Sequence, residues 1–309
     1  MSMLFLAPEL DTQPWVKHLQ RQDPGLDLRI WPEVGAPEDV LFVLSWKHPL
    51  GIMKRFPRLK CIASLGFGVD HVLRDPDLPT GVPVTRIVDA GMVDAMSTYV
   101  LAAVLSHTRH FNLYRRDQAL KTWTARIPKH PHDVRVGIMG LGHLGSDAAR
   151  KLHALGFPVS GWSRTPKSID GVTGFAGEGD LDTFLSAADI LICLLPLTSA
   201  TQGILNRRTL SKLPAGAYLI NAARGEHLME GDLIAALESG HLSGACLDVF
   251  REEPLPESHP FWSHPQVTVT PHVASLTYPQ DVAPQIVANY HRVRAGQLPW
   301  NIVDLKRGY

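Results

Sequence analysis

Cysteine is scarce in this chain of 309 residues, where only Cys61, Cys193 and Cys246 occur, far apart and without a C-x-x-C pair. Each lies in an apolar run, which predicts buried, reduced thiols in a cytoplasmic protein rather than a disulfide framework. The chain also lacks an excess of charge of one sign, because 30 Lys and Arg residues balance 30 Asp and Glu residues. Bulk charge therefore argues against a protein that binds nucleic acid or an anionic membrane.

Long apolar runs are missing as well, since none approaches the roughly 20 residues that span a bilayer. The first residues, Met1–Glu9, have no basic segment and only a short apolar run, so we expect a strand there rather than a signal peptide. Hydrophobic residues nevertheless make up 45% of the chain, which is enough for a sizeable core. The length suits two domains better than one.

What recurs along the chain is a short apolar run followed by a helical pattern, which is typical of parallel α/β sheets. The predicted strands are residues 3–6, 28–30, 40–44, 61–64 and 82–84 in the first part, and 134–139, 159–162, 190–195, 217–220, 244–249 and 267–270 in the second. A long helix is predicted from about Ala95 to Ala119. The tail is too short to form a domain, so we expect residues 1–97 and 275–309 to form one domain and 98–274 an inserted second one.

A glycine-rich turn follows the strand predicted over 134–139. Gly140, Gly142 and Gly145 have the G-x-G-x-x-G spacing, and a helix is predicted to follow them. In this setting the first glycine permits a tight turn, the second lets backbone amides approach a pyrophosphate, and the third allows the helix to pack closely on the sheet. The alternative is an ordinary strand–turn–helix with spare glycines, but the full context favours a dinucleotide-binding domain.

The end of the next predicted strand indicates which dinucleotide binds. An Asp or Glu at this place would bind the ribose 2′-hydroxyl of NAD, whereas this chain has Ser163, Arg164 and Thr165. Arg164 can pair with a 2′-phosphate, to which the two hydroxyls can donate hydrogen bonds. A solvated surface arginine is the alternative. Because the carboxylate is absent as well, we expect NADP, with NADPH preferred over NADH.

Polar side chains follow three further predicted strands. Arg224, Asp248 and His272 lie at these strand ends, and Glu253 comes shortly after Asp248. Taken singly, each could be an ordinary surface residue, but the carboxyl ends of parallel strands meet at the edge where ligands bind. Hydride transfer to a ketone needs a proton donor, which His272 suits at neutral pH, with Glu253 to orient it. Arg224 offers a planar fork for the carboxylate of a 2-oxo acid.

With these residues in place, the chain resembles the D-isomer-specific 2-hydroxyacid dehydrogenases over nearly its whole length. The matching segments are Gly66–Asp70, Gly140–Gly145, Asn221–Gly225, Leu247–Phe250 with Glu253–Leu255, and Pro271-His272. Subgroup features, among them Gly156-Phe157-Pro158 and Trp162–Thr165, are most similar to the glyoxylate/hydroxypyruvate reductase A subgroup. The resemblance implies two doubly wound parallel sheets, with an NADP-binding Rossmann domain inserted in a flavodoxin-like substrate domain. It also implies a homodimer and NADPH-dependent reduction of glyoxylate to glycolate and of hydroxypyruvate to glycerate.

The resemblance also assigns site residues. Arg224, Glu253 and His272 would be catalytic, and Asp248 would lie near the nicotinamide carboxamide. The residues assigned to cofactor binding are Gly140, Gly142, His143, Leu144, Gly145, Ser163, Arg164, Thr165, Leu195, Pro196, Ala222, Arg224, Asp248 and His272. Those assigned to substrate binding are Trp46, Leu65, Gly66, Phe67, Gly68, Arg224 and His272, with the glycine-containing loop presenting amides to the substrate carboxylate.

Two parts of this interpretation stay open. Trp46 either caps the substrate pocket and limits it to small acids or is a core tryptophan, and Phe67 stands where small residues are common. A bulkier substrate such as phenylpyruvate is therefore an alternative. A non-catalytic nucleotide-sensing protein of the same fold is another, but the complete set of Arg224, Glu253 and His272 argues against it.

We expect no metal site, because His130 and His132 have no third ligand at a suitable spacing.

Overall fold

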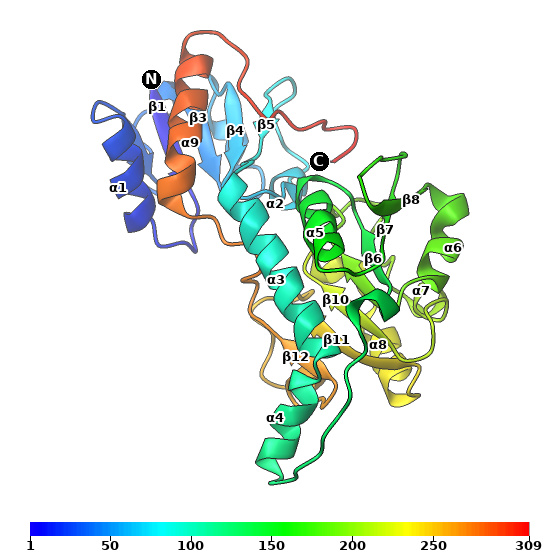
Figure 1. Ribbon diagram of the computed structural model, residues 1–309. Helices are drawn as coiled ribbons and strands as arrows, with labels where there is room; N and C mark the ends of the chain where they lie inside the picture. Colours follow the sequence, from blue (N-terminus) through cyan, green and yellow to red (C-terminus); the bar gives the residue numbers. More distant parts are fainter. Residues whose placement is uncertain (309) are drawn as a thin grey trace. The chain divides into compact units, whose positions relative to one another are not determined.

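The computed structural model describes residues 1–308 and divides into two compact units (Figure 1). The first unit comprises Met1–Met92 and the chain from Thr277 onward, and the second comprises Val93–Leu276. Tyr309, the last residue of the expected C-terminal segment, lies outside the described residues. The second unit is therefore a continuous stretch of chain, and the first is assembled from two stretches.

The first unit is built on a five-stranded parallel sheet with the order β2-β1-β3-β4-β5. Its strands are β1 (Ser2–Leu6), β2 (Leu28–Ile30), β3 (Val40–Ser45), β4 (Cys61–Ser64) and β5 (Val84–Thr85), and its helices are α1 (Gln13–Gln22), α2 (Asp70–Leu73) and α9 (Pro279–Arg294). This is the flavodoxin-like order, as expected. Helices α1 and α9 pack side by side, which brings the C-terminal stretch onto the N-terminal one (Figure 1).

The second unit contains a seven-stranded parallel sheet with the order β12-β11-β10-β9-β6-β7-β8. Its strands are β6 (Val136–Met139), β7 (Val159–Ser163), β8 (Val172–Ala176), β9 (Ile190–Cys193), β10 (Ala217–Asn221), β11 (Leu242–Leu247) and β12 (Val267–Val269). Its helices are α4 (Phe111–Ala119), α5 (His143–Ala154), α6 (Leu181–Ser186), α7 (Arg207–Leu210), α8 (Glu230–Glu238) and most of α3 (Ala90–Thr108). The strand order reverses between β6 and β9, which makes this edge the switch point of a Rossmann fold, as expected.

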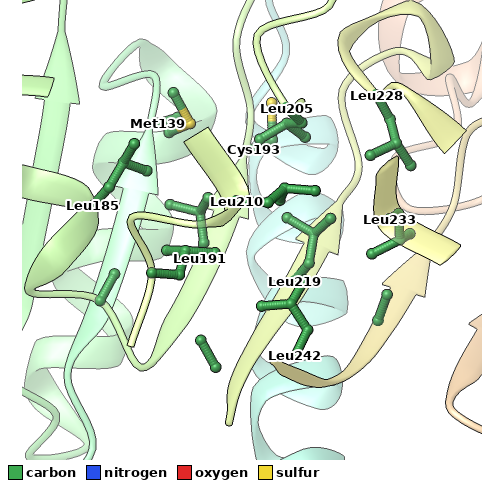
Figure 2. Packing of buried hydrophobic residues seen from close by; sticks show 14 of the residues in the cluster. Met139, Leu185, Leu191, Cys193, Leu205, Leu210, Leu219, Leu228, Leu233 and Leu242 are labelled. Atoms are coloured by element: carbon green, nitrogen blue, oxygen red, sulfur yellow. The ribbon is translucent and has the colours of Figure 1, made fainter. Parts of the chain in front are cut away.

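The central strands β6, β9 and β10 of the second unit are buried along their whole length because both faces of the sheet are covered there. Alternate residues of a strand point to opposite faces, so Leu191 and Leu219 join one buried cluster while Ile192 and Ile220 join the other. Figure 2 shows the first of these clusters, in which Leu210 and Leu233 pack with the leucines of the strands. Short 3₁₀ helices complete the fold at Pro37–Asp39, Ile52–Arg55, Pro131–Asp133, Glu178–Asp180, Gly225–His227 and Pro260–Trp262.

Two expectations about the second unit were wrong. The long helix predicted from Ala95 to Ala119 is two helices, α3 and α4, because His110 between them has a left-handed φ of 62° that an α-helix cannot continue. The six strands predicted for this unit are seven, because β8 was missed. This strand lies at the edge of the sheet and is at most half-buried, so its sequence carries only a weak apolar signal.

None of the helices within residues 1–308 is long and apolar enough to cross a membrane.

Candidate active site

The glycine-rich turn joins β6 to α5 at the switch point of the second sheet. Gly140 has a left-handed φ of 102°, and a Cβ there would lie 2.7 Å from the carbonyl oxygen of Leu194. A Cβ on Gly145 would overlap the carbonyl oxygen of Gly140, so neither glycine can be replaced without moving backbone. Gly142 caps the N-terminus of α5 and faces open space, since a Cβ there would meet no heavy atom within 4 Å. The turn thus fits a pyrophosphate against the first amides of the helix.

The other residues expected around the cofactor lie on neighbouring strand ends. His143 is exposed and Leu144 half-buried in the first turn of α5. Leu195 and Pro196 follow β9 directly across the switch point, and the Pro196 carbonyl accepts the Thr201 hydroxyl at 2.7 Å. Ala222, just after β10, is buried, and its amide donates to the carbonyl of Cys193 at 3.3 Å.

The turn after β7 carries the residues expected at a 2′-phosphate. Ser163 is buried, and its hydroxyl donates to the carbonyl of Thr165 at 2.8 Å, which closes the turn. The side chains of Arg164 and Thr165 are exposed. Trp162, the residue before this turn, is held in place by its indole N–H, which donates a hydrogen bond to the carbonyl of Gly177 at 2.8 Å. An exposed arginine at this strand end suits an anionic ligand better than a bare ribose.

His272 and Glu253 are in direct contact, although they lie nineteen residues apart. His272 Nδ1 is 2.8 Å from Glu253 Oε2, and Glu253 Oε1 accepts the amide of Phe250 at 3.0 Å. The backbone of His272 is left-handed, with a φ of 54°, and its N–H donates to the carbonyl of Asp248 at 2.8 Å. Because Glu253 occupies Nδ1, Nε2 is the ring nitrogen that can exchange a proton with another group.

Asp248 holds the segment that carries His272. Its buried carboxylate accepts the Thr270 hydroxyl at 2.6 Å and the amides of Val273 and Ala274 at 2.9 Å each. Thr270 is in turn 2.8 Å from the hydroxyl of Tyr99 on α3. Asp248 therefore holds residues on both sides of the histidine, through the Thr270 side chain before it and two backbone amides after it.

Arg224 follows β10 in a turn ordered by buried polar side chains. The Asn221 side-chain amide donates to the carbonyl of Arg224 at 3.0 Å, and its oxygen accepts the amide of Ala223 at 3.2 Å. The Arg224 amide lies 3.2 Å from Nδ1 of His227, which is fully buried. Since β10, β11 and β12 are neighbours, the chain places Arg224, Asp248 and His272 after three consecutive strands of one sheet.

The residues expected at the substrate carboxylate lie in the first unit, after β3 and β4. The amides of Leu65 and Gly66 donate within this unit, to the carbonyl of Ser45 at 3.0 Å and the hydroxyl of Ser64 at 3.1 Å. Trp46 is half-buried and lies on Gly66, where a Cβ would be 2.8 Å from the indole Cζ3. The Phe67 ring lies 4.9 Å from the guanidinium of Arg86.

Comparison with known proteins shows which family the chain belongs to. The sequence model described as "D-isomer specific 2-hydroxyacid dehydrogenase, NAD binding domain" matches residues 101–274. The chain is 45% identical to glyoxylate/hydroxypyruvate reductase A of Yersinia enterocolitica and 44% identical to that of Serratia proteamaculans, with both chains covered completely in each case. This chain belongs to the D-isomer-specific 2-hydroxyacid dehydrogenase family. The resemblance drawn from the sequence is confirmed.

Solved structures of the family agree with this fold. A D-isomer specific 2-hydroxyacid dehydrogenase from Xanthobacter autotrophicus, in complex with NADPH and MES, has a TM-score of 0.94 and 44% identity, covering 100% of this chain and 99% of its own. An NADPH-dependent glyoxylate/hydroxypyruvate reductase from Sinorhizobium meliloti, in complex with NADP and sulfate, has a TM-score of 0.94 and 36% identity over 100% of both chains.

The sequence analysis gave no role to several polar residues that support the assigned residues of this site. Buried Asn221 and His227 and half-buried Thr270 were not assigned a role from the sequence, yet they hold the backbone or the carboxylate of assigned residues. Asn221 begins one of the matching family segments, whereas the sequence signal for His227 and Thr270 is only a polar side chain near the end of an apolar strand. Within the part of the chain that the structure describes, no group of three His, Cys, Asp or Glu side chains could hold a metal ion.

Proposed function

We propose that this protein reduces small 2-oxo acids with NADPH, converting glyoxylate to glycolate and hydroxypyruvate to glycerate. The observation that carries this proposal is the 2.8 Å contact of His272 with Glu253, on the sheet whose switch point bears the dinucleotide glycines. Relatives that cover the whole chain are named glyoxylate/hydroxypyruvate reductase A. Solved relatives contain NADPH or NADP.

NADP is the cofactor of this chain, and the described residues fit it. The open N-terminus of α5 at Gly142 suits the pyrophosphate, and the exposed Arg164 suits the 2′-phosphate. NADPH, when bound, supplies the hydride that reduces the substrate carbonyl. We propose that Leu195, Pro196 and Ala222 line the cofactor from the strands across the switch point.

Side chains of the second unit supply the proton for this reduction and the positive charge that binds the substrate. We propose that Arg224 binds the 2-oxo acid, since its guanidinium matches a carboxylate and polarises the adjacent carbonyl. His272 Nε2 donates a proton to the carbonyl oxygen as the carbonyl carbon accepts the hydride, which yields the 2-hydroxy acid. Glu253 orients the imidazole through Nδ1 and stabilises the imidazolium before its proton leaves.

Residues of the first unit are proposed to select small acids. We propose that the backbone of the Leu65–Gly68 loop binds the substrate carboxylate. Trp46 lies on this loop, so its ring favours a short side chain on the substrate. The proposal of a cap at Trp46 rests on this contact.

The test is an assay of NADPH and NADH oxidation, followed by the absorbance of the reduced nicotinamide, with glyoxylate, hydroxypyruvate, pyruvate and phenylpyruvate. Fast NADPH oxidation with the first two acids is expected. A preference for NADH would overturn the role of Arg164, and a preference for phenylpyruvate would overturn that of Trp46. Tight NADPH binding without turnover of any acid would favour the nucleotide-sensing alternative.

We further propose a homodimer. The helix α4 and the segment after it expose large apolar side chains, which soluble proteins usually cover: Phe111 is 61%, Leu120 67%, Trp123 100% and Ile127 96% exposed. A second copy of this chain would cover them. Light scattering with size-exclusion chromatography should give a dimer for the wild type and a monomer for Trp123→Ser combined with Ile127→Ser. The control is Leu298→Ser, another exposed apolar residue, and a dimeric double variant would contradict the proposal.

A cytoplasmic location completes the proposal. Cys61, Cys193 and Cys246 are buried and form no disulfide, and burial raises the pKa of the Cys61 and Cys193 thiols to about 12. Reduced, unreactive thiols are typical of cytoplasmic proteins. Fractionation of cells into cytoplasmic and extracytoplasmic material tests the location directly, and recovery outside the cytoplasm would contradict it.

A further inference from the structure

The ends of β3 and β4 carry two buried serine–histidine pairs, which the proposed mechanism does not use. The strands are paired so that Ser45 lies opposite Ser64. Ser45 Oγ is 2.8 Å from His48 Nδ1, and Ser64 Oγ is 2.9 Å from His71 Nε2. All four side chains are buried, with at most 5% exposed. The two pairs are alike in chemistry but differ in what they contact.

The Ser64 hydroxyl makes three contacts, two of them to the loop that follows it. It donates to the carbonyl of Gly68 at 2.9 Å and accepts the amide of Gly66 at 3.1 Å. A hydroxyl has one proton to donate and two lone pairs to accept with. The third contact must therefore be a hydrogen bond that His71 Nε2–H donates, so the protein environment sets the tautomer of the histidine.

His71 also reaches the segment after β3. With its proton on Nε2, Nδ1 is the acceptor, and the amide of Lys47 donates to it at 3.2 Å. Lys47 has a left-handed φ of 47°, an unfavourable conformation for lysine that this hydrogen bond stabilises. The Trp46 ring packs on the imidazole at 4.5 Å between centroids, and the same ring lies on Gly66.

We infer that His71, acting through Ser64 and Lys47, is the positioning residue that fixes the Leu65–Gly68 loop and Trp46 for binding of a 2-oxo acid. This rests on the proposed function, which assigns the substrate carboxylate to that loop. One imidazole fixes the backbone of the loop on one side and the backbone next to Trp46 on the other. The Ser45–His48 pair makes no such link, because His48 Nε2 binds Asp75, whose carboxylate accepts the amides of Gly51 and Asp77.

The matched test is Ser64→Ala against Ser45→Ala, which removes the same hydroxyl from adjacent, paired positions. Ser64→Ala should raise KM for glyoxylate about tenfold or more, with kcat within about threefold and KM for NADPH unchanged, because substrate binding alone is loosened. Ser45→Ala should leave both KM values within about twofold. His71→Phe should resemble Ser64→Ala, and His71→Gln, which retains a donor for Ser64, should recover part of the loss.

Hydrogen-exchange rates of backbone amides in the same variants measure the order of the loop without depending on enzyme activity. The amides of Lys47 and Gly66 should exchange faster in Ser64→Ala and His71→Phe than in Ser45→Ala. Equal KM values and equal exchange in the two serine variants would overturn the inference. If the wild type reduces no 2-oxo acid, the proposed function fails, and the exchange comparison alone then decides whether His71 and Ser64 order the loop.

Discussion

At the scale of single residues, the proposed proton donor is held from several directions at once. Its ring is fixed by Glu253, its amide by the carbonyl of Asp248, and the residues after it by the Asp248 carboxylate. Such contacts keep His272 in a left-handed backbone conformation that costs free energy by itself. The polar groups of this site therefore hold a geometry that the local sequence would not adopt alone.

Glu253→Gln tests the charge in this arrangement. The side-chain oxygen of glutamine can still accept a hydrogen bond from the backbone N–H of Phe250, but the uncharged side chain no longer stabilises a positive imidazole. We therefore expect kcat to fall roughly 100-fold while KM for NADPH stays unchanged. Steady-state kinetics with glyoxylate provides the measurement. Glu252→Gln is the matched control, since the neighbouring carboxylate is exposed. Equal kcat values for the two variants would contradict the role assigned to Glu253.

The site residues that could be predicted from the sequence are those that follow the ends of predicted strands. The family spacing pointed to Glu253 and His272, and the structure brings these two into contact. Ser64 and His71 could not be found in this way, because their contact depends on how a loop folds back onto the end of β4. A serine and a histidine seven residues apart carry no pattern in the sequence that distinguishes this contact from two solvated side chains.

At the scale of elements, the turns after β10 and β11 approach each other closely at Gly225. A Cβ on Gly225 would overlap the backbone carbonyl of Phe250, so Gly225→Ala must push apart the turns that carry Arg224 and Glu253. We expect a loss of stability of about 1–3 kcal/mol and a lower kcat/KM. Gly231→Ala is the control, because a Cβ there on α8 meets nothing within 4 Å and should be neutral or stabilising. Urea unfolding and kinetics measure both effects, and equal behaviour would refute the argument.

Elements with a strong apolar signal were predicted, and those that depend on context were not. The buried strands β3, β6 and β10 lie where their apolar runs indicated. Strand β8 was missed because an edge strand is only partly buried, and its glycine at 174 weakens the pattern further. The break between α3 and α4 was missed because His110 adopts a left-handed conformation that its residue type does not announce.

At the scale of the whole molecule, stability should fall as the pH drops from neutral toward 5. Burial lowers the pKa of His48, and it lowers that of His107 to about 4, whereas an unfolded histidine has a pKa of about 6.5. Between these values the unfolded chain binds more protons, so acid favours unfolding. We expect the free energy of unfolding to be about 1–2 kcal/mol lower at pH 5 than at pH 7.5, measured with urea at one protein concentration.

His107→Phe isolates one of these groups. The ring of His107 stacks on Tyr218 with 3.9 Å between centroids, and phenylalanine keeps a ring there without a proton to bind. The variant should lose part of the difference in unfolding free energy between the two pH values. Carboxylates such as Asp75, whose pKa is below its usual value, affect stability only at lower pH. An unchanged difference would show that His107 does not stay neutral in the folded protein.

The division into two units makes a prediction about the isolated cofactor-binding unit. Both buried clusters around the seven-stranded sheet draw all their members from residues 93–276, and so does the complete set of residues assigned to NADPH. A fragment from Ala90, where α3 begins, to Leu276 should therefore fold cooperatively and bind NADPH within about tenfold of the full chain, as measured by calorimetry. It should reduce no glyoxylate, because the Leu65–Gly68 loop is missing. Binding about a hundredfold weaker would mean that the first unit contributes directly to the cofactor site, and detectable reduction would mean that the loop is not needed to bind the substrate.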